Sequence, residues 1–465
     1  MQLVRALGMP LVLRLTSVIV LGLVIIRPAV AVADTGYAVE DLGVLPGDSS
    51  SVAWAINENG DVVGWSTGPT GSHAFVYTDA AGMVALPGLP NKPRSIARDI
   101  NDAGVVVGSA NAGGTDLGHA VVWSDGSVQD LGTLGTGAFS EAWGINNLGQ
   151  VVGWSDTNGG SGLTAVHGFL YTQARGLVDL TPQSDSGSAY DINDAGQVTG
   201  YRTALGGYHA FRWQQGAMED LGVLPDFAHS FGRALNASGQ VAGNATSASG
   251  NSEHLFRSLE GGGLQDLGGQ GEHNVAFGIN ASGDVVGTRG QSATRAVLYT
   301  DAGGLQDLDT FIDPSLGWVL LGAHDVNDSG QIIGYAFNNF TGQTHAVRLQ
   351  PTDGPPPACT FHCLRSTAIA LRSTVSSSET RLVTARVKVR DETAAAMPFA
   401  LVVVRWTRPN GSTRDFNVWT NQNGVATTTV QGRRGLYTVT IVNLALSQYV
   451  FDPTHGVLQK SITVP

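Results

Sequence analysis

Charged residues and cysteines are both scarce in this chain of 465 residues: 14% of the residues are charged and two are cysteine. Long amphipathic helices need more Glu, Lys and Leu than the sequence offers, so a helical protein is excluded. The 62 glycines favour many short strands joined by tight turns. The length indicates two or three domains.

Residues 1–33 have the pattern of a signal peptide. Two arginines lie at or before the start of an uncharged apolar run, Leu15–Ile26. This run is shorter than the roughly 20 residues that a membrane span requires. Small residues over Ala29–Ala33 match a cleavage site, so we expect the mature chain to begin at Asp34. The chain is therefore expected to be exported, to the cell surface or the medium, with the periplasm as an alternative.

The net charge narrows the choice of partners. The whole chain carries −12, and the predicted signal peptide contains three arginines and no acid, which leaves −15 for the mature chain. An acidic surface argues against nucleic acid and anionic lipid as partners. No second apolar run is long enough to span a membrane, and we expect a monomer without a cofactor.

The two cysteines, Cys359 and Cys363, lie four residues apart beside His362. Export permits a disulfide, and this spacing can be bridged where the chain turns. A metal site is the alternative, but it would crowd three ligands into one turn and lack a fourth. We therefore expect a local disulfide.

One pattern, Asn-x-x-Gly-x-(Val/Ile)-x-Gly, occurs seven times, with successive copies 43 to 47 residues apart. Each asparagine follows an aliphatic residue, and a small residue lies four positions before it. The asparagines are Asn57, Asn101, Asn146, Asn193, Asn236, Asn280 and Asn327. Such a regular period indicates a repeat architecture.

The sequence of each copy predicts four short strands. Asn and Gly three residues apart favour a tight turn between the first two strands. The third strand starts with His-Ala-Phe or a close variant in six copies and with Arg295 in the remaining one. The fourth carries Asp-Leu-Gly or a relative, which degrades to Ala85-Leu86-Pro87 in the first copy.

The chain ends of the repeat region complement each other. Glu40-Asp41-Leu42-Gly43 is a fourth-strand motif with no copy before it, and the last copy lacks a fourth strand. The N-terminal strand can thus complete the last copy and leave no open edge. Residues 37–350 are accordingly predicted to form a seven-bladed β-propeller. An open β-solenoid is the alternative.

The repeated motifs resemble the bacterial extracellular repeats named after their His-Ala-Phe signature, over about residues 37–350. The resemblance implies an exported bacterial repeat protein and implies no catalytic residues. Copy five departs from the signature at Leu255 and copy six at Arg295.

A different pattern follows the repeats. Residues 351–363 form a proline-rich linker that includes the cysteine pair, and residues 364–465 form a separate domain. Within it, residues 380–463 alternate as strands, with turns at Pro409–Gly411 and Asn421–Gly424. This predicts a β-sandwich. Val402–Trp406, Thr420–Ala426 and Gly435–Val439 resemble bacterial immunoglobulin-like modules, which implies a spacer or adhesion role.

One variable position stands out in every copy, directly after the small residue. It is aromatic or basic throughout: Trp54, Arg98, Trp143, Tyr190, Arg233, Phe277 and His324. On an innermost strand these side chains would surround the axis, where aromatics can stack on sugars and arginines can bind carboxylates. Inter-blade packing is the alternative, because Trp54 and Ile56 would share one face of a regular strand.

Two patterns could be interpreted as metal sites, but each has a simpler structural explanation. The third-strand histidines could form a metal-binding ring, but hydrogen bonds within each blade explain them better, because one metal site needs three or four ligands and six copies carry a histidine. Asp-x-Asn-Asp-x-Gly at Asp99, Asp191 and Asp325 is similar to a calcium loop, yet position five is Ala or Ser and position twelve is not Glu. A turn accounts for the same residues.

No sequence motif for catalysis is present, and Asp116 and Glu141 are examples of acids that do not follow the repeat. The first hypothesis is a non-enzymatic binding or adhesion module for polysaccharide or a cell-surface protein. A structural surface or matrix protein without a discrete ligand is the second. A propeller-type carbohydrate-active enzyme is the third, because a fold does not determine a function.

Overall fold

The computed structural model describes residues 36–90, 94–111, 118–158, 166–182, 186–269, 274–290, 294–352, 363–375, 381–391, 394–445, 450–451 and 458–464. Their regular structure is β throughout, apart from two 3-10 helices, η1 (Leu308–Phe311) and η2 (Pro314–Leu316), which confirms the predicted all-β class. The predicted signal peptide, Asp116 and Cys359 lie outside the described residues. None of the described helices has the length and apolar character needed to cross a bilayer.

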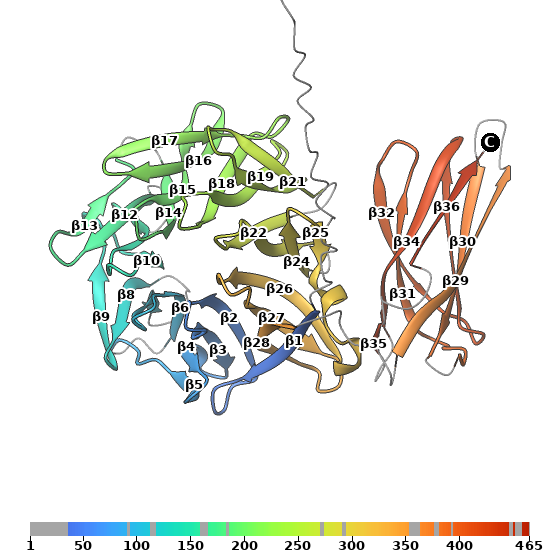
Figure 1. Ribbon diagram of the computed structural model, residues 1–465, viewed down its shortest axis with the longest axis horizontal. Helices are drawn as coiled ribbons and strands as arrows, with labels where there is room; N and C mark the ends of the chain where they lie inside the picture. The colour runs from blue at the N-terminus through green and yellow to red at the C-terminus, as the bar shows by residue number, and fades with distance from the viewer. Residues whose placement is uncertain are drawn as a thin grey trace, which may run out of the picture.

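The repeat region forms four-stranded antiparallel sheets that stand around a common centre, in a β-propeller-like ring (Figure 1). The first three are β2 (Ser50–Ile56), β3 (Val62–Gly68), β4 (Gly71–Thr78) and β5 (Gly82–Ala85); β6 (Arg94–Ile100), β7 (Val106–Asn111), β8 (His119–Ser124) and β9 (Ser127–Gly132); and β10 (Ser140–Ile145), β11 (Val151–Asp156), β12 (Val166–Thr172) and β13 (Gly176–Asp179). The next three are β14 (Gly187–Ile192), β15 (Val198–Ala204), β16 (Gly207–Gln214) and β17 (Ala217–Gly222); β18 (His229–Leu235), β19 (Val241–Thr246), β20 (Glu253–Ser258) and β21 (Leu264–Gly268); and β22 (Asn274–Ile279), β23 (Val285–Arg289), β24 (Arg295–Thr300) and β25 (Gly304–Asp307). The last is β26 (Trp318–Val326), β27 (Ile332–Asn338) and β28 (Gln343–Thr352), completed by β1 (Gly36–Gly43).

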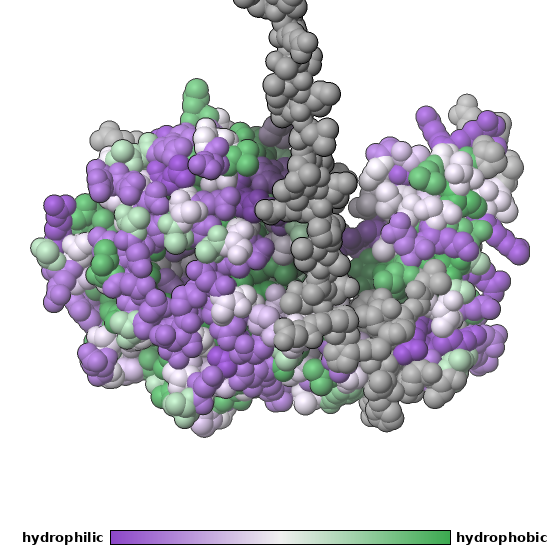
Figure 2. Space-filling model, in the orientation of Figure 1, coloured by the Kyte–Doolittle hydropathy of each residue, from purple (hydrophilic) through white to green (hydrophobic). Residues whose placement is uncertain are grey.

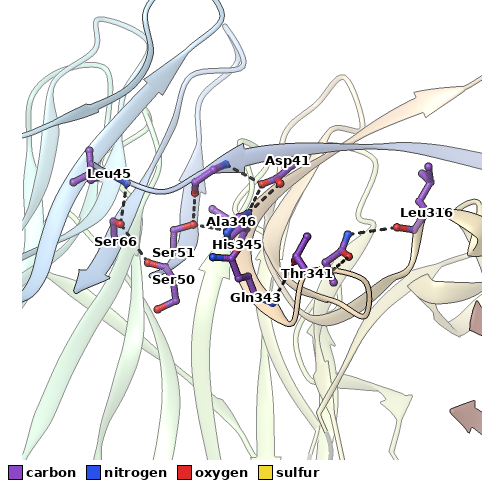
Figure 3. Close-up of polar contacts among 12 residues, drawn as sticks. Asp41, Leu45, Ser50, Ser51, Ser66, Leu316, Thr341, Gln343, His345 and Ala346 are labelled. Carbon is purple, nitrogen blue, oxygen red and sulfur yellow. Dashed lines mark hydrogen bonds and ion pairs between the residues drawn. The ribbon is translucent and has the colours of Figure 1, made fainter. Parts of the chain in front are cut away.

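The two ends of the repeat region meet in this last sheet, which confirms the predicted role of the N-terminal strand. β1 pairs antiparallel with β28 from Gly36 opposite Thr352 onward. In Figure 3, the carboxylate of Asp41 contacts Nδ1 of His345 at 2.8 Å, and the amide of Ala346 donates to Oγ of Ser51 in the first sheet. β28 also runs two residues into the stretch predicted as a linker, because β1 offers it backbone partners there.

Buried Arg348 of β28 also joins the last sheet to β1 and to the first sheet. Its side chain is only 4% exposed and pairs with Glu40 of β1 at 2.8 Å and with Asp79 of the first sheet. It also donates to the carbonyl of Gly60 at 2.6 Å. The last sheet is therefore bonded to both its own N-terminal strand and the first sheet, as a closed ring requires and an open solenoid does not.

The repeated asparagines form hydrogen bonds between neighbouring sheets. Nδ2 of Asn57 donates to the carbonyl of Asn101 at 3.1 Å, and the same bond recurs from Asn101, Asn146, Asn193 and Asn236 to the asparagine of the following copy. Asn327 returns to the carbonyl of Asn57 at 3.1 Å. Oδ1 of the same side chains accepts turn amides, as Asn146 does from Leu148 and Gln150. The asparagine thus serves both the predicted turn and the contact between sheets.

The third-strand histidines lie within their own sheets. In five of the six, Nδ1 contacts the aspartate of the fourth strand, in the pairs His119–Asp130, His167–Asp179, His209–Asp220, His254–Asp266 and, through β1, His345–Asp41. The expectation of hydrogen bonds inside each copy is confirmed for these five. The described residues contain no group of three or more His, Cys, Asp or Glu side chains placed to hold a metal.

The C-terminal residues form two further four-stranded sheets. One is β33 (Val425–Gly432), β30 (Arg381–Arg390), β29 (Cys363–Val375) and β35 (Val450–Phe451); the other is β32 (Thr413–Trp419), β31 (Leu401–Thr407), β34 (Gly435–Ala445) and β36 (Gln459–Val464). Both sheets contribute to one core that includes Trp406 and Tyr437. Cys363, predicted as part of the linker, is the first residue of β29. The predicted disulfide to Cys359 stays a prediction.

Candidate functional site

A bulge in each innermost strand positions the variable residue. The register of β2 against β3 shifts between Ala53 and Ala55, so Trp54 is the extra residue, and the same shift recurs at the other six variable positions. A β-bulge interrupts the alternation of faces and re-aims a side chain. The expectation that Trp54 and Ile56 share one face of a regular strand is therefore wrong.

The last glycine of the repeated motif makes room for this bulge. A Cβ on Gly64 would overlap the carbonyl oxygen of Val52, and the equivalent glycine meets the equivalent carbonyl in all seven copies. The seven are Gly64, Gly108, Gly153, Gly200, Gly243, Gly287 and Gly334. The invariant glycine therefore permits the bulge that positions the variable residue.

The variable side chains converge at the centre of the ring. We call Trp54, Arg98, Trp143, Tyr190, Arg233, Phe277 and His324 the axial cluster. The ring of Trp54 lies 5.8 Å from that of Trp143, 5.7 Å from Phe277 and 4.3 Å from His324, although these residues belong to four different sheets. His324 is buried and the other six are half-buried. The cluster is thus both packed between sheets and partly open to solvent.

The space left at the axis is small. A cavity of about 110 Å³ is lined by the axial cluster together with Ala55, Asp99, Asp191, Ala234 and Asp325. Drug-sized ligands occupy pockets of about 300 Å³ or more. This cavity therefore suits a few water molecules, and a larger ligand would have to lie against the outer surface of the cluster.

A second tier of aromatic side chains lies on the axial cluster. Trp65 lies 5.4 Å from Trp54, Tyr201 lies 5.8 Å from Tyr190, and Tyr335 stacks on His324 at 5.4 Å, all between ring centroids. We define the second tier as Trp65, Trp154, Tyr201 and Tyr335, all half-buried. Sequence reasoning missed these residues, yet each directly follows the last glycine of its motif. An aromatic residue directly after the last glycine of the motif was the sequence signal that could have identified them.

Glu141 belongs to this site. Its Oε1 accepts from Nε of Arg98 at 2.8 Å and its Oε2 from Nε1 of Trp154 at 3.2 Å. The guanidinium of Arg98 lies 4.6 Å from the ring centre of Trp54 and 4.3 Å from that of Trp143. An arginine between aromatic faces gains cation–π attraction as well as the ion pair. One of the two irregular acids noted in the sequence is therefore a site residue.

Three aspartates beneath the axial cluster explain the calcium-like motif. Oδ2 of Asp99 accepts from the amide of Ile145 at 2.7 Å, and Asp191 and Asp325 bind the amides of Leu235 and Ile56 in the same way. Each aspartate thus bonds its innermost strand to that of the next sheet. The interpretation as a turn was incomplete, because these carboxylates connect neighbouring sheets at the axis.

Burial raises the pKa of Asp191 to about 6 and that of Asp325 to about 7, and it raises the pKa of Asp99 well above its usual value. The negative charge of Asp191 adds to the effect of burial at Asp99. His324 shifts the other way: burial lowers its pKa to about 4. Its Nδ1 lies 2.8 Å from the carbonyl of Ala53, so the ring donates there as a neutral imidazole.

These shifts predict the pH dependence of an Asp325→Asn variant. Between about pH 4 and pH 7, folded Asp325 keeps a proton that the unfolded chain releases, so its contribution to stability falls as the pH rises. The variant lacks this titration. We expect its loss of thermal midpoint, relative to the unmodified protein at the same pH, to be largest near pH 4.5 and to shrink toward pH 7.5. A loss that grows with pH over this range would contradict the prediction.

A separate groove borders the first sheet, where the Asp-Leu-Gly motif is degraded. Without that aspartate, Nδ1 of His73 contacts Asp48 at 3.3 Å, and its Nε2 lies 3.0 Å from Oγ1 of Thr70. The groove has a volume of about 760 Å³, and its lining includes these three residues with Leu45 and Leu86. It is concave and partly apolar, but it lies apart from the axial cluster.

The described surface of the ring shows no dominant apolar patch in the view of Figure 2, where hydrophilic residues prevail and apolar ones are scattered. Large exposed apolar patches usually mark protein or membrane contacts.

Comparisons with known proteins concern the fold alone. No family model and no curated protein matches the chain. Among solved structures, the chain is similar to a puromycin-hydrolyzing peptidase of Mycobacterium tuberculosis, with 11% identity and a TM-score of 0.45 over 76% of this chain and 60% of that one. It is also similar to TolB of Acinetobacter baumannii, with 12% identity and a TM-score of 0.35 over 68% of this chain and 66% of that one. Likeness at this level indicates no activity.

Proposed function

We propose that this chain is an exported seven-bladed β-propeller, followed by an immunoglobulin-like module, that binds polysaccharide at the axial cluster. The observation that carries the proposal is the convergence of two tiers of half-buried aromatic side chains with Arg98, Arg233 and Glu141 at the centre of the ring. Aromatic faces stack on the apolar faces of sugars, and the polar groups among them can bind hydroxyls.

The size of the axial cavity limits the binding mode. A space of about 110 Å³ does not enclose a sugar ring, so the polymer lies across the cluster as on a platform. Such a surface suits a chain longer than the site. The immunoglobulin-like module then serves as a spacer that holds the propeller away from its attachment.

The proposal is tested by glycan-array binding of the chain from Asp34 to Pro465 and of two variants, Trp65→Ala and Tyr335→Ala. Loss of one stacking ring removes about 1 kcal/mol, so we expect binding to weaken about fivefold in each variant. Trp419→Ala is the matched control, because Trp419 is 65% exposed on the C-terminal sheet β32. Thermal midpoints measured in parallel separate lost contacts from lost folding.

Two outcomes would favour the other hypotheses. Absence of binding to every glycan would support a structural surface or matrix protein. Cleavage of a bound glycan that Glu141→Gln abolishes would support a carbohydrate-active enzyme.

A further inference from the structure

The two arginines of the axial cluster differ in their partners among the described residues: one forms an ion pair and the other does not. Arg98 forms an ion pair with Glu141 at 2.8 Å, and both side chains are 14% exposed. Arg233 donates from Nε to the amide oxygen of Asn244 at 3.1 Å. In the described part of the chain, no carboxylate lies within ion-pairing distance of Arg233. Arg98 is therefore paired directly with a carboxylate, whereas Arg233 has a neutral amide as its hydrogen-bond partner.

The surroundings of Arg233 hold this charge among aromatic rings. Its guanidinium carbon lies 4.6 Å from the ring centre of Tyr190 and 5.6 Å from that of Phe231. The residue is half-buried. A desolvated cation is costly unless it is paired, and a guanidinium fixed by Nε still presents its two terminal nitrogens. The geometry is that of a receptor for a planar anion.

An aromatic track extends from this arginine to the surface. Phe231 lies 5.1 Å from Tyr201 and 5.9 Å from Tyr208, and Tyr208 lies 5.6 Å from His229, all between ring centroids. Tyr208 is 38% exposed, so the track reaches solvent. Sugar rings can stack along it while one substituent reaches Arg233.

We propose, resting on the function proposed above, that the polysaccharide is acidic and that Arg233 binds the carboxylate of a uronic acid residue. The guanidinium and the carboxylate are both planar and can form two parallel hydrogen bonds. The track of Tyr201, Phe231 and Tyr208 supports the neighbouring sugars. The net negative charge of the protein repels anionic polymers at long range, so recognition depends on this short-range contact.

The test compares polymers that differ only in their carboxylates. Polygalacturonate, alginate and hyaluronan are each titrated against the chain from Asp34 to Pro465 beside their methyl-esterified forms. We expect at least one acidic polymer to bind tenfold or more tightly than its ester, because a charge-assisted pair contributes about a factor of ten or more.

Substitutions identify the responsible group. Arg233→Gln should remove this preference, because it weakens binding of the acidic polymer more than binding of the ester until the two bind alike. Arg233→Lys keeps the charge but not the planar fork, so we expect it to recover only part of the preference. Arg414→Gln, on the exposed face of β32, is the control for a general loss of positive charge. Thermal midpoints show whether each variant is folded.

The outcomes separate this inference from the proposed function. Equal binding of acidic and esterified polymers, or a preference that survives in Arg233→Gln, would overturn the role of Arg233 while polysaccharide binding stands. Failure of every polymer in both forms, together with an empty glycan array, would overturn both proposals.

Discussion

A chain that begins at Val44 should lose the cooperative unfolding transition shown by a chain that begins at Asp34. The shorter chain lacks β1, and with it buried Leu42 and the acids that face His345 and Arg348. Burial of a leucine contributes about 2 kcal/mol, and each backbone hydrogen bond between β1 and β28 contributes about 1 kcal/mol net. Arg348 keeps Asp79 but loses Glu40. The combined loss is comparable to the stability of a typical domain, about 5–15 kcal/mol.

The measurement is thermal unfolding followed by circular dichroism, with limited proteolysis to locate the opened sheets. A synthetic peptide of residues 34–46, added to the shorter chain, should restore part of the transition by re-forming the last sheet. Equal thermal midpoints for the two chains would show that β1 does not close the ring.

Gly153→Ala should be among the most damaging single substitutions in the repeat region outside the hydrophobic core. A Cβ at this position would overlap the carbonyl oxygen of Glu141 and lie 2.8 Å from Cζ of Phe169. The innermost strand would have to give up the bulge at Trp143, and neighbouring Glu141 would have to move as well. We expect a loss of about 3 kcal/mol in the free energy of unfolding, together with loss of glycan binding.

Gly149→Ala is the matched control for this substitution. Gly149 lies four residues earlier in the same motif, at a φ of +71°, and a Cβ there meets nothing within 4 Å. Only the left-handed backbone conformation is penalised, at about 1 kcal/mol. Comparable losses from the two substitutions in chemical denaturation would contradict the role assigned to the bulge.

The repeat pattern predicted the architecture of the ring because turns and chain ends are local features. Asn57 and its counterparts marked every first turn, and Asp41 identified the strand that completes the last sheet. The C-terminal strand β29 was not predicted, because it lies beyond the Pro-rich segment, where Arg365, Arg372 and several small residues obscure the alternation.

The site was predicted only in part. The axial cluster could be recognised because one variable position was always aromatic or basic. Its bulge could not, since a register shift depends on which residues of two strands face each other. The pairing of Glu141 with Arg98 and Trp154 likewise joins side chains from different strands and sheets, and no local sequence pattern records it.

The hydrogen bonds of the repeated asparagines affect which substitutions the propeller-like ring can accept. Among the described residues, six of these bonds join neighbouring sheets, and none of them involves the side chains that face the axis. Mutations at Trp54, Arg98 or Arg233 leave these bonds untouched. The residues that face a ligand can therefore vary from copy to copy while these hydrogen bonds between sheets are kept. A combinatorial library confined to the axial cluster and the second tier would test new ligands without redesign of the remaining sheets.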